Sequence, residues 1–436
     1  MGFSNSKKAV LTATALAVAL AVPAVASAAT YTWTGGGASG DWSDSGNWSG
    51  GTVGVPSGTT FFNTASVTQN NTLLNVPGNF GGIVVGGGAN QPYSITINPT
   101  TVNNGNGGYS AFQFLNTFSV QDDGGTGASL TLNGTVRPFQ DGNIFNAQTQ
   151  NIVMTEGVAF RNDIHNSVAL QASGGANVVI EGGLANANSG NNDANLLKVA
   201  NAVGGYTILT NAADSFQPQS VNSSSSYSPW IGGVNISNQG DTGDDTGPGA
   251  LMVENGNTDS ATGSGPVNMA QTGAILGGVG TVGGTVTMNA ASVLKPGITF
   301  DSTFTTPSPS TGTLSLGALD MNGKLGTFDF YLSGSSNSLI SVTGALTLSS
   351  TGVISLSGTP MLGTYHLFDY GSLVNPSDLS SWTITGPSGF NYSLLDNMSN
   401  SSIDLVVAAT PEPAALGMLA LGAGVCLLGL KRRKSA

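Results

Sequence analysis

Short segments in which apolar and polar residues alternate recur along this 436-residue chain, and they constrain its fold more than any other feature. Such segments, of the kind Ser-Ile-Thr-Ile-Asn, occur at 94–98, 129–133, 285–288, 313–316 and 345–348. Alternation gives a segment one apolar face and one hydroxyl-bearing face, which is typical of a half-buried β-strand. Glycine and asparagine between the segments supply the positive φ angles of tight turns. We therefore expect an all-β protein.

The spacing of these segments favours one of two β architectures. Many short strands fit either a sandwich or barrel, or a solenoid of stacked coils. The apolar centres recur irregularly, at intervals of about ten to thirty residues, and the coils of a parallel β-helix tolerate loops of such variable length. Asparagine-rich turns also favour stacking, because amide side chains on successive coils bond to one another in ladders. The spacing thus favours a parallel β-helix.

Several segments in the second half of the chain carry a resemblance to a known family. They include Thr-Ile-Leu-Thr-Asn at 207–211, Leu-Gly-Gly-Val-Gly-Thr-Val at 276–282 and Leu-Lys-Pro-Gly at 294–297, and the series continues at 339–344 and 363–367. In type and order they resemble the autotransporter-associated β-strand repeat and the passenger region that follows it. The resemblance implies that the fold is a right-handed parallel β-helix.

The same resemblance suggests how the chain is divided. We expect a β-solenoid over 29–304 and a passenger-like β section over 305–409, separated at the proline-containing segment 305–312. An autotransporter ends in an outer-membrane barrel of alternating strands. We expect no such barrel here, because few residues follow Val374 and the last of them form an apolar tail.

The beginning of the chain has the pattern of a secretory signal. Two lysines precede an apolar stretch at 9–22, and the small residues Ala26-Ser27-Ala28 follow it. A basic start, an apolar stretch and a small-residue cleavage site define a signal peptide. We therefore expect residues 1–28 to be removed on export, with Ala26 and Ala28 at the cleavage site.

The other end of the chain is an apolar segment with a basic flank. Residues 414–430 contain no charged side chain, and as a helix they would measure about 25 Å, near the thickness of a bilayer core. The basic cluster Lys431-Arg432-Arg433-Lys434 follows directly. Basic flanks stay on the cytoplasmic side, so we expect a single transmembrane helix that anchors the exported chain.

Three residues just before the apolar run make this end more specific. Pro411, Glu412 and Pro413 stand where the PEP-CTERM sorting signal of Gram-negative bacteria has its triplet, and residues 410–434 resemble that signal in order and spacing. The resemblance implies recognition of the segment 410–436 by an exosortase after export through the Sec translocon, and delivery to the cell surface or the extracellular matrix. A simple membrane anchor is the alternative interpretation.

Charge and cysteine content exclude several functions. The stretch 29–410 holds five basic and 22 acidic residues, a net charge of −17. Such a surface repels nucleic acid and anionic lipid, so we expect no nucleic-acid partner. The only cysteine, Cys426, lies in the apolar tail. The exported part therefore has no disulfide, no cysteine nucleophile and no cysteine-based zinc site.

Few residues are suited to catalysis. His366 lies in an alternating segment and is expected to face solvent, whereas His165, near Glu156, fits a surface loop better than an acid–base pair. We predict no catalytic residues and no enzymatic activity. A β-helical polysaccharide-degrading enzyme is the alternative, and it would need several carboxylates converging in one groove beside Arg137 or Arg161.

One acidic loop offers ligands for a cation. Asp241, Asp244 and Asp245 provide the oxygen atoms that calcium prefers. The loop lacks the glycine-rich repeat that builds stacked calcium turns. A solvated loop is therefore the better interpretation, and we predict no metal and no cofactor.

Three of the five tryptophans, Trp33, Trp42 and Trp48, fall within sixteen residues near the start of the exported chain. One interpretation is a cap that covers the open edge of the first coil, which would otherwise template aggregation. The other is a platform on which sugar rings stack, as in a lectin-like protein. We favour the cap.

Together these features predict a secreted surface or extracellular-matrix protein with a structural or adhesive role. Stacked strands would form a stiff rod whose polar faces make many weak contacts with exopolysaccharide or with other copies. A glycan-degrading enzyme and a glycan-binding protein remain the alternatives.

Overall fold

A computed structural model describes most of the chain between residues 30 and 410. The described ranges are 30–54, 59–63, 71–74, 82–86, 94–99, 111–114, 119–122, 129–138, 143–148, 151–161, 167–187, 196–202, 204–211, 227–237, 247–256, 259–374 and 379–410. The signal segment 1–28 and the tail 411–436 lie outside these ranges.

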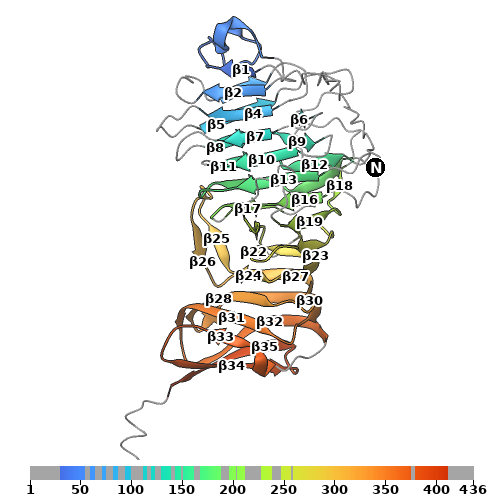
Figure 1. The fold of residues 1–436 in the computed structure, drawn as a ribbon, viewed down its shortest axis with the longest axis vertical. Coiled ribbons are helices and arrows are strands. Elements are labelled where there is room, and N and C mark those ends of the chain that lie inside the picture. Colours follow the sequence, from blue (N-terminus) through green and yellow to red (C-terminus); the bar gives the residue numbers. More distant parts are fainter. Residues whose placement is uncertain are drawn as a thin grey trace, which may run out of the picture.

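The described residues form one long sheet of fifteen strands, here called the first sheet (Figure 1). Its spatial order is β1 (Thr30–Trp33), β2 (Thr59–Asn63), β4 (Gly82–Gly86), β7 (Ser119–Asp122), β10 (Asn143–Ala147), β13 (Ser167–Ala172), β16 (Leu196–Val199), β19 (Gly233–Ile236), β21 (Val267–Met269), β23 (Thr281–Met288), β27 (Thr313–Asp320), β30 (Leu339–Thr347), β32 (Gly363–Val374), β35 (Ser402–Ala409) and β34 (Phe390–Asn397).

A second sheet of thirteen described strands accompanies it. Its order is β3 (Asn71–Leu74), β5 (Ser94–Pro99), β8 (Ser129–Leu132), β11 (Asn151–Met154), β14 (Asn177–Ile180), β17 (Tyr206–Leu209), β20 (Ala250–Val253), β22 (Ile275–Gly278), β24 (Ser292–Pro296), β28 (Gly326–Gly334), β31 (Gly352–Pro360) and β33 (Thr383–Thr385), with β29 (Ser336–Asn337) paired to β28.

Smaller elements complete the described structure. A third sheet has the order β18 (Tyr227–Pro229), β15 (Leu184–Ala187), β12 (Val158–Arg161), β9 (Thr135–Pro138) and β6 (Ala111–Phe114), and β25 (Ile298–Phe300) pairs with β26 (Pro307–Pro309). Three 3-10 turns cover Ser45–Asn47, Ser49–Gly51 and Leu379–Ser381. Among the described residues there is no helix long and apolar enough to cross a membrane.

The chain visits the sheets in turn. β10, β11 and β12 belong to the first, second and third sheets, and β13 then returns to the first sheet beside β10. The first sheet is parallel from β1 to β32, and only its last two strands, β35 and β34, pair antiparallel. Each circuit therefore adds strands beside those of the previous circuit, and the strands stack along the long axis of the molecule (Figure 1). The all-β prediction is confirmed.

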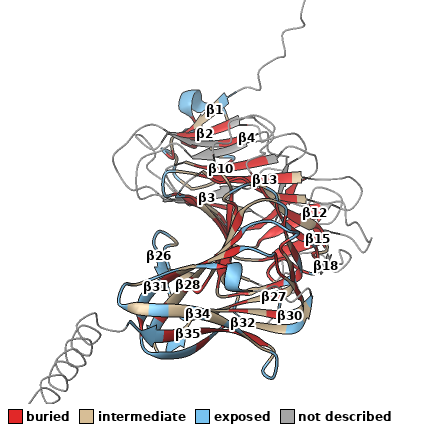
Figure 2. Ribbon diagram, turned by 60° about the horizontal axis from the view of Figure 1, so that its bottom comes forward, coloured by how far each residue is buried: buried red, intermediate tan, exposed pale blue. Residues whose placement is uncertain are grey.

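Because neighbouring strands are parallel and in register, apolar residues lie beside apolar residues on successive strands, and together they form the core. Phe145 lies opposite Leu170, Leu170 opposite Val199, and Val199 opposite Ile236 on successive strands of the first sheet. All four side chains are buried in one apolar cluster that extends from the first strand to β35, and Figure 2 shows buried residues along strands throughout the stack. Burial of each such side chain stabilises the fold by about 1.5–3 kcal/mol.

The division expected at 305–312 does not coincide with a break in either sheet. β27 pairs with β23 on one side and with β30 on the other, so the first sheet crosses this point without interruption. The prolines at 307 and 309 instead lie in β26, the return strand of a hairpin that leaves the stack between β24 and β27. What changes beyond this point is strand length, which reaches twelve residues in β32.

Candidate functional site

Trp33, Trp42 and Trp48 form a compact cluster where β1 and the loop after it meet. Trp33 lies in β1 and pairs with Trp48 in an isolated antiparallel bridge. The ring of Trp48 lies 5.2 Å from that of Trp33 and 4.8 Å from that of Trp42. The Trp42 indole N–H donates to the carbonyl of Gly54 at 2.7 Å, and the Trp48 indole N–H donates to the carbonyl of Trp42 at 2.8 Å.

The burial of the three rings bears on both interpretations of this cluster. Trp33 and Trp42 are completely buried and Trp48 is 3% exposed, so none of the three rings has a face on which a sugar could stack. The burial argues against the stacking role and is what a cap requires. The loop is held by Asn47, whose amide donates to the carbonyls of Ser39 and Asp41.

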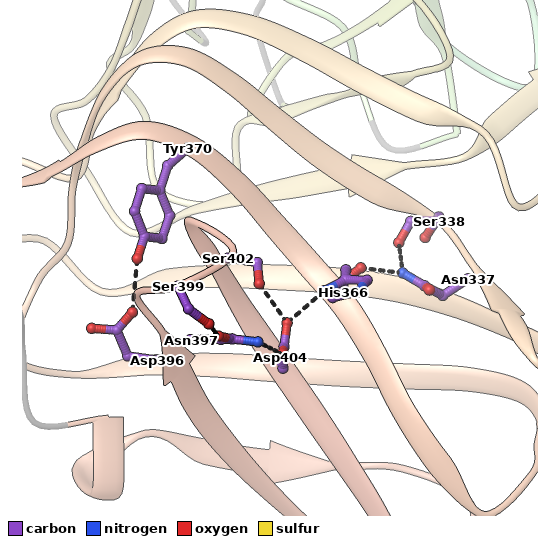
Figure 3. Close-up of polar contacts among 9 residues, drawn as sticks. All are labelled: Asn337, Ser338, His366, Tyr370, Asp396, Asn397, Ser399, Ser402 and Asp404. Carbon is purple, nitrogen blue, oxygen red and sulfur yellow. Dashed lines mark hydrogen bonds and ion pairs between the residues drawn. The ribbon is translucent and has the colours of Figure 1, made fainter.

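A polar cluster at the opposite end of the stack contains a histidine–aspartate pair (Figure 3). His366 in β32 and Asp404 in β35 are direct partners across an antiparallel ladder. The imidazole Nδ1 lies 2.7 Å from Asp404 Oδ1. The His366 side chain is 53% exposed, as expected from its alternating segment, whereas the Asp404 side chain is only 2% exposed.

Two further side chains hold the Asp404 carboxylate. Ser402 Oγ donates to Oδ1 at 2.8 Å and Asn397 Nδ2 donates to Oδ2 at 2.9 Å. Burial by itself raises the pKa of Asp404, but the hydrogen bonds from Asn397, Ser402 and His366 outweigh it, so the pKa lies below its usual value. The carboxylate is therefore kept charged and fixed in orientation.

The His366–Asp404 pair has one feature of catalytic and cation-binding sites, an imidazole oriented by a carboxylate. A carboxylate that fixes one ring nitrogen orients the imidazole, as in acid–base sites and around metal-bound histidines. The nearby hydroxyls are otherwise engaged, because Ser402 bonds to Asp404 and Ser399 Oγ donates to Asn397 Oδ1 at 2.7 Å. The described residues contain no group of three or more His, Cys, Asp or Glu side chains placed to hold a metal ion.

Next to this pair, Tyr370 donates from its hydroxyl to Asp396 Oδ1 at 2.8 Å. Burial, together with this bond and the neighbouring carboxylate charges, raises the pKa of Tyr370 to about 12. The tyrosine therefore remains a neutral donor, and it ties β32 to β34 across β35. The whole cluster acts as a polar clasp on the last three strands of the first sheet.

The hairpin formed by β25 and β26, here called the arm (residues 298–309), lies along the side of the stack (Figure 1). It covers an apolar row on the outward face of the second sheet. This row, here called the strip, consists of Val153, Val179, Ile208 and Met252, which are aligned in register on β11, β14, β17 and β20.

Polar and aromatic contacts hold the arm on the strip. The amide of Asn151 donates to the carbonyl of Thr303 at 2.9 Å, and the amide of Asn177 donates to the carbonyl of Phe304. The ring of Phe300 meets that of Tyr206 edge-on with 5.3 Å between centroids.

The carboxyl group of Glu254 contacts the base of the arm. The backbone N–H of Phe300 donates to Glu254 Oε1 at 2.6 Å. Burial raises the pKa of Glu254 to about 7, against the lowering effect of this bond. Glu181, which occupies the corresponding turn after β14, also has a raised pKa because of burial.

Most of the remaining residues singled out by the sequence lie outside the residues that the structure describes. The cation candidates Asp241, Asp244 and Asp245 and the histidine His165 lie outside the described residues. So do all sorting and cleavage residues, namely Ala26, Ala28, Pro411, Glu412, Pro413, Lys431, Arg432 and Arg433. Arg137 is buried in β9.

Sequence reasoning missed Asp404, Glu254 and the arm. The arm had a signal: strands 177–180 and 250–253 read Asn-Val-Val-Ile and Ala-Leu-Met-Val, and they lack the alternation seen elsewhere. Consecutive apolar residues indicate burial on both faces, which here means the core on one side and the arm on the other.

Comparisons with models of known protein families, with curated proteins and with solved structures give no match.

Proposed function

We propose that this chain is a secreted structural or adhesive protein of the bacterial envelope, built as a right-handed parallel β-helix and delivered to the cell surface or extracellular matrix by its C-terminal sorting signal. The observation that carries the proposal is the stacking itself. Two sheets, mostly parallel, accompany each other from one end of the described chain to the other, and the chain passes from sheet to sheet on each circuit. That circulation supports a β-helix.

A rod of this kind offers long faces with repeated polar groups. Asn322 donates to Asn289 at 2.8 Å, and Asn289 donates to Asn268 at 2.6 Å, so amides of successive circuits form a ladder along the first sheet. A repeated surface makes many weak contacts with a repeated polymer or with other copies, and avidity replaces affinity at any single point. This supports adhesion or matrix assembly.

The proposed location outside the cell is based on the signal segment 1–28 and the tail 411–436. Export through the Sec translocon, anchoring by 414–430 and recognition by an exosortase at Pro411-Glu412-Pro413 would place the rod outside the cell. Exopolysaccharide is the partner that such a location suggests, and the net charge of −17 over 29–410 disfavours nucleic acid and anionic lipid.

The decisive experiment separates a sorting signal from a simple anchor. Cells expressing the full chain are compared with cells expressing a deletion of 411–436 and with cells expressing the triple variant Pro411→Ala, Glu412→Ala, Pro413→Ala. The triple variant keeps the apolar run and the basic flank. Fractionation and intact mass of the product are measured for each.

A sorting signal requires that the triple variant stays in the membrane at full tail length while the native chain is shortened and reaches the surface. The proposal fails if the triple variant and the native chain have the same mass and the same location. An unchanged location after the complete deletion would remove the anchor as well.

A β-helical polysaccharide-degrading enzyme is the second candidate, and the oriented His366–Asp404 pair is the observation that favours it. Loss of polysaccharide depolymerisation in His366→Ala, with unchanged circular dichroism, would support this function. Absence of depolymerisation by the native chain on the polysaccharide of its own host removes it.

A further inference from the structure

The arm is attached to the stack in a way that lets it leave without breaking a sheet. Its two ends meet where the N–H of Ser310 donates to the carbonyl of Gly297. The second sheet continues from β24 to β28, and the first continues from β23 to β27, whether or not the arm is in place. Gly297 has a φ of 79°, a conformation that glycine adopts without strain.

The face of the second sheet beneath the arm differs in polarity from the rest of that face. Along the outward row that contains the strip, the positions before and after it carry no apolar side chain. Thr96 and Thr131 precede Val153. Gly277 and then Lys295 follow Met252, and Lys295 is paired with Asp329 at 3.0 Å. Val179 and Ile208 are completely buried and Met252 is 1% exposed. Apolar side chains thus occupy this face on the circuits that the arm covers, and hydrated ones lie on either side.

Glu254 contributes a carboxyl group to this contact. Its hydrogen bond comes from the arm, through Phe300 N–H. The titratable groups nearest in the contact are Tyr206, whose ring packs on Phe300, and Asp301, whose carboxylate is bonded to Thr303 and Thr305 within the arm. Neither supplies a positive charge, and Lys295 is paired with Asp329. An ionised Glu254 is therefore partly desolvated without a cation to offset the cost.

We propose that the arm opens in a pH-dependent way: it is closed over the strip when Glu254 is protonated and is released when Glu254 ionises. Opening admits water to the carboxylate and uncovers Val179, Ile208 and Met252. The device depends only on the described contacts and is independent of the surface or matrix role proposed above.

The direction and the size of the pH effect on arm closure follow from the titration of Glu254. A carboxyl that titrates at about 7 with the arm closed, and near 4.5 in water, favours the closed arm at low pH. That preference is complete below about pH 4.5 and is lost as the pH rises through about 7. Between about pH 5.5 and about pH 8.5 the closing equilibrium weakens by up to roughly 30-fold, the value reached when the arm supplies all of the burial of Glu254.

Hydrogen exchange of the full chain, read by mass spectrometry, tests this directly. Peptides that cover 298–309 are followed at the two pH values, after correction for intrinsic exchange. Peptides from β30 and β32 report that the stack stays folded. Glu254→Gln keeps a carbonyl acceptor for Phe300 N–H but cannot ionise. Glu181→Gln removes a second carboxyl whose pKa is raised by burial and which lies at the corresponding turn, where no contact described above joins it to the arm.

We expect the native chain and Glu181→Gln to lose arm protection by a similar factor of up to roughly 30 at the higher pH, while Glu254→Gln stays protected at both. Equal protection of the native arm at both pH values overturns the proposal. So does a loss in Glu254→Gln that matches the native chain.

Discussion

Removal of one indole from the tryptophan cluster tests whether that cluster closes the end of the stack. In Trp42→Ala the lost ring is completely buried, and its neighbours Trp33, Trp48 and Phe62 lie within 6.5 Å between ring centroids. A buried tryptophan removes about 150–250 Å² from water, which corresponds to about 4–6 kcal/mol. Measured tryptophan truncations cost about 3–5 kcal/mol. The carbonyl of Gly54 also loses its donor, so we expect a cost of about 3–5 kcal/mol.

The loss of stability caused by Trp42→Ala should be confined to the circuits near the tryptophan cluster. In a stack of coils each circuit contacts only its neighbours, so the loss of a cap frays the adjacent circuits and leaves distant ones intact. Free energies of opening from hydrogen exchange should therefore fall by this amount in β1 and β2 and remain unchanged in β30. Trp42→Phe serves as the matched control, since it keeps an apolar ring and loses only part of the volume and the N–H donor. We expect the control to cost less than half as much.

Two results would contradict this reasoning. A decrease below about 1 kcal/mol in β1 and β2 would mean that the buried rings do not hold the first circuits. Reduced retention on polysaccharide by Trp42→Ala, with unchanged protection, would return the cluster to a glycan-binding role that its burial now argues against.

Two further predictions concern the polar clasp and the close packing of circuits. Asp404→Asn should destabilise β34 and β35 by about 1–3 kcal/mol near neutral pH, and His366→Ala by less, because Ser402 and Asn397 still bond the carboxylate. Since the folded pKa of Asp404 is lowered, this stabilisation is present above the unfolded value near 3.8 and is lost as the pH falls, so acid unfolding of Asp404→Asn should show a shallower pH dependence. Gly263→Ala would place its Cβ 1.7 Å from the carbonyl oxygen of Trp230, whereas a Cβ at Gly323, with a similar positive φ, meets nothing within 4 Å. Gly323→Ala should cost about 1 kcal/mol, and thermal unfolding should show a loss several times larger for Gly263→Ala.

Local pattern was sufficient to predict strands but not their partners. The alternating segments at 94–98 and 129–133 coincide with β5 and β8, and those at 313–316 and 345–348 fall within or at the end of the longer β27 and β30. Alternation records which face of a strand meets the core, and this information is local. Which strand lies beside which is set by the closure of each circuit through loops of different length, and no single segment contains it.

The histidine–aspartate pair shows the same limit. The sequence indicated that His366 lies in an alternating strand and faces solvent, which its exposure confirms. Asp404 lies 38 positions further along the chain, and it meets His366 because β35 runs antiparallel to β32. In the rest of the first sheet, neighbours are parallel and separated by a whole circuit. The reversal has no marker in composition, so the partner of His366 could not be inferred from the sequence.

The arm connects these observations, because it explains where the alternating pattern is lost. A strand with water on one face keeps polar residues there, as Thr96 and Thr131 do on the second sheet. Val179 and Ile208 occupy equivalent positions further along the same row, and exposed they would form an apolar stripe on a flat sheet face, a known aggregation hazard. Their presence is compatible with a soluble exterior only if another segment covers them, and the arm is that segment. Departures from alternation in a stacked β fold therefore indicate where something covers the outside. In this chain they lead to Glu254, a partly buried acid whose carboxyl group accepts a hydrogen bond from the arm.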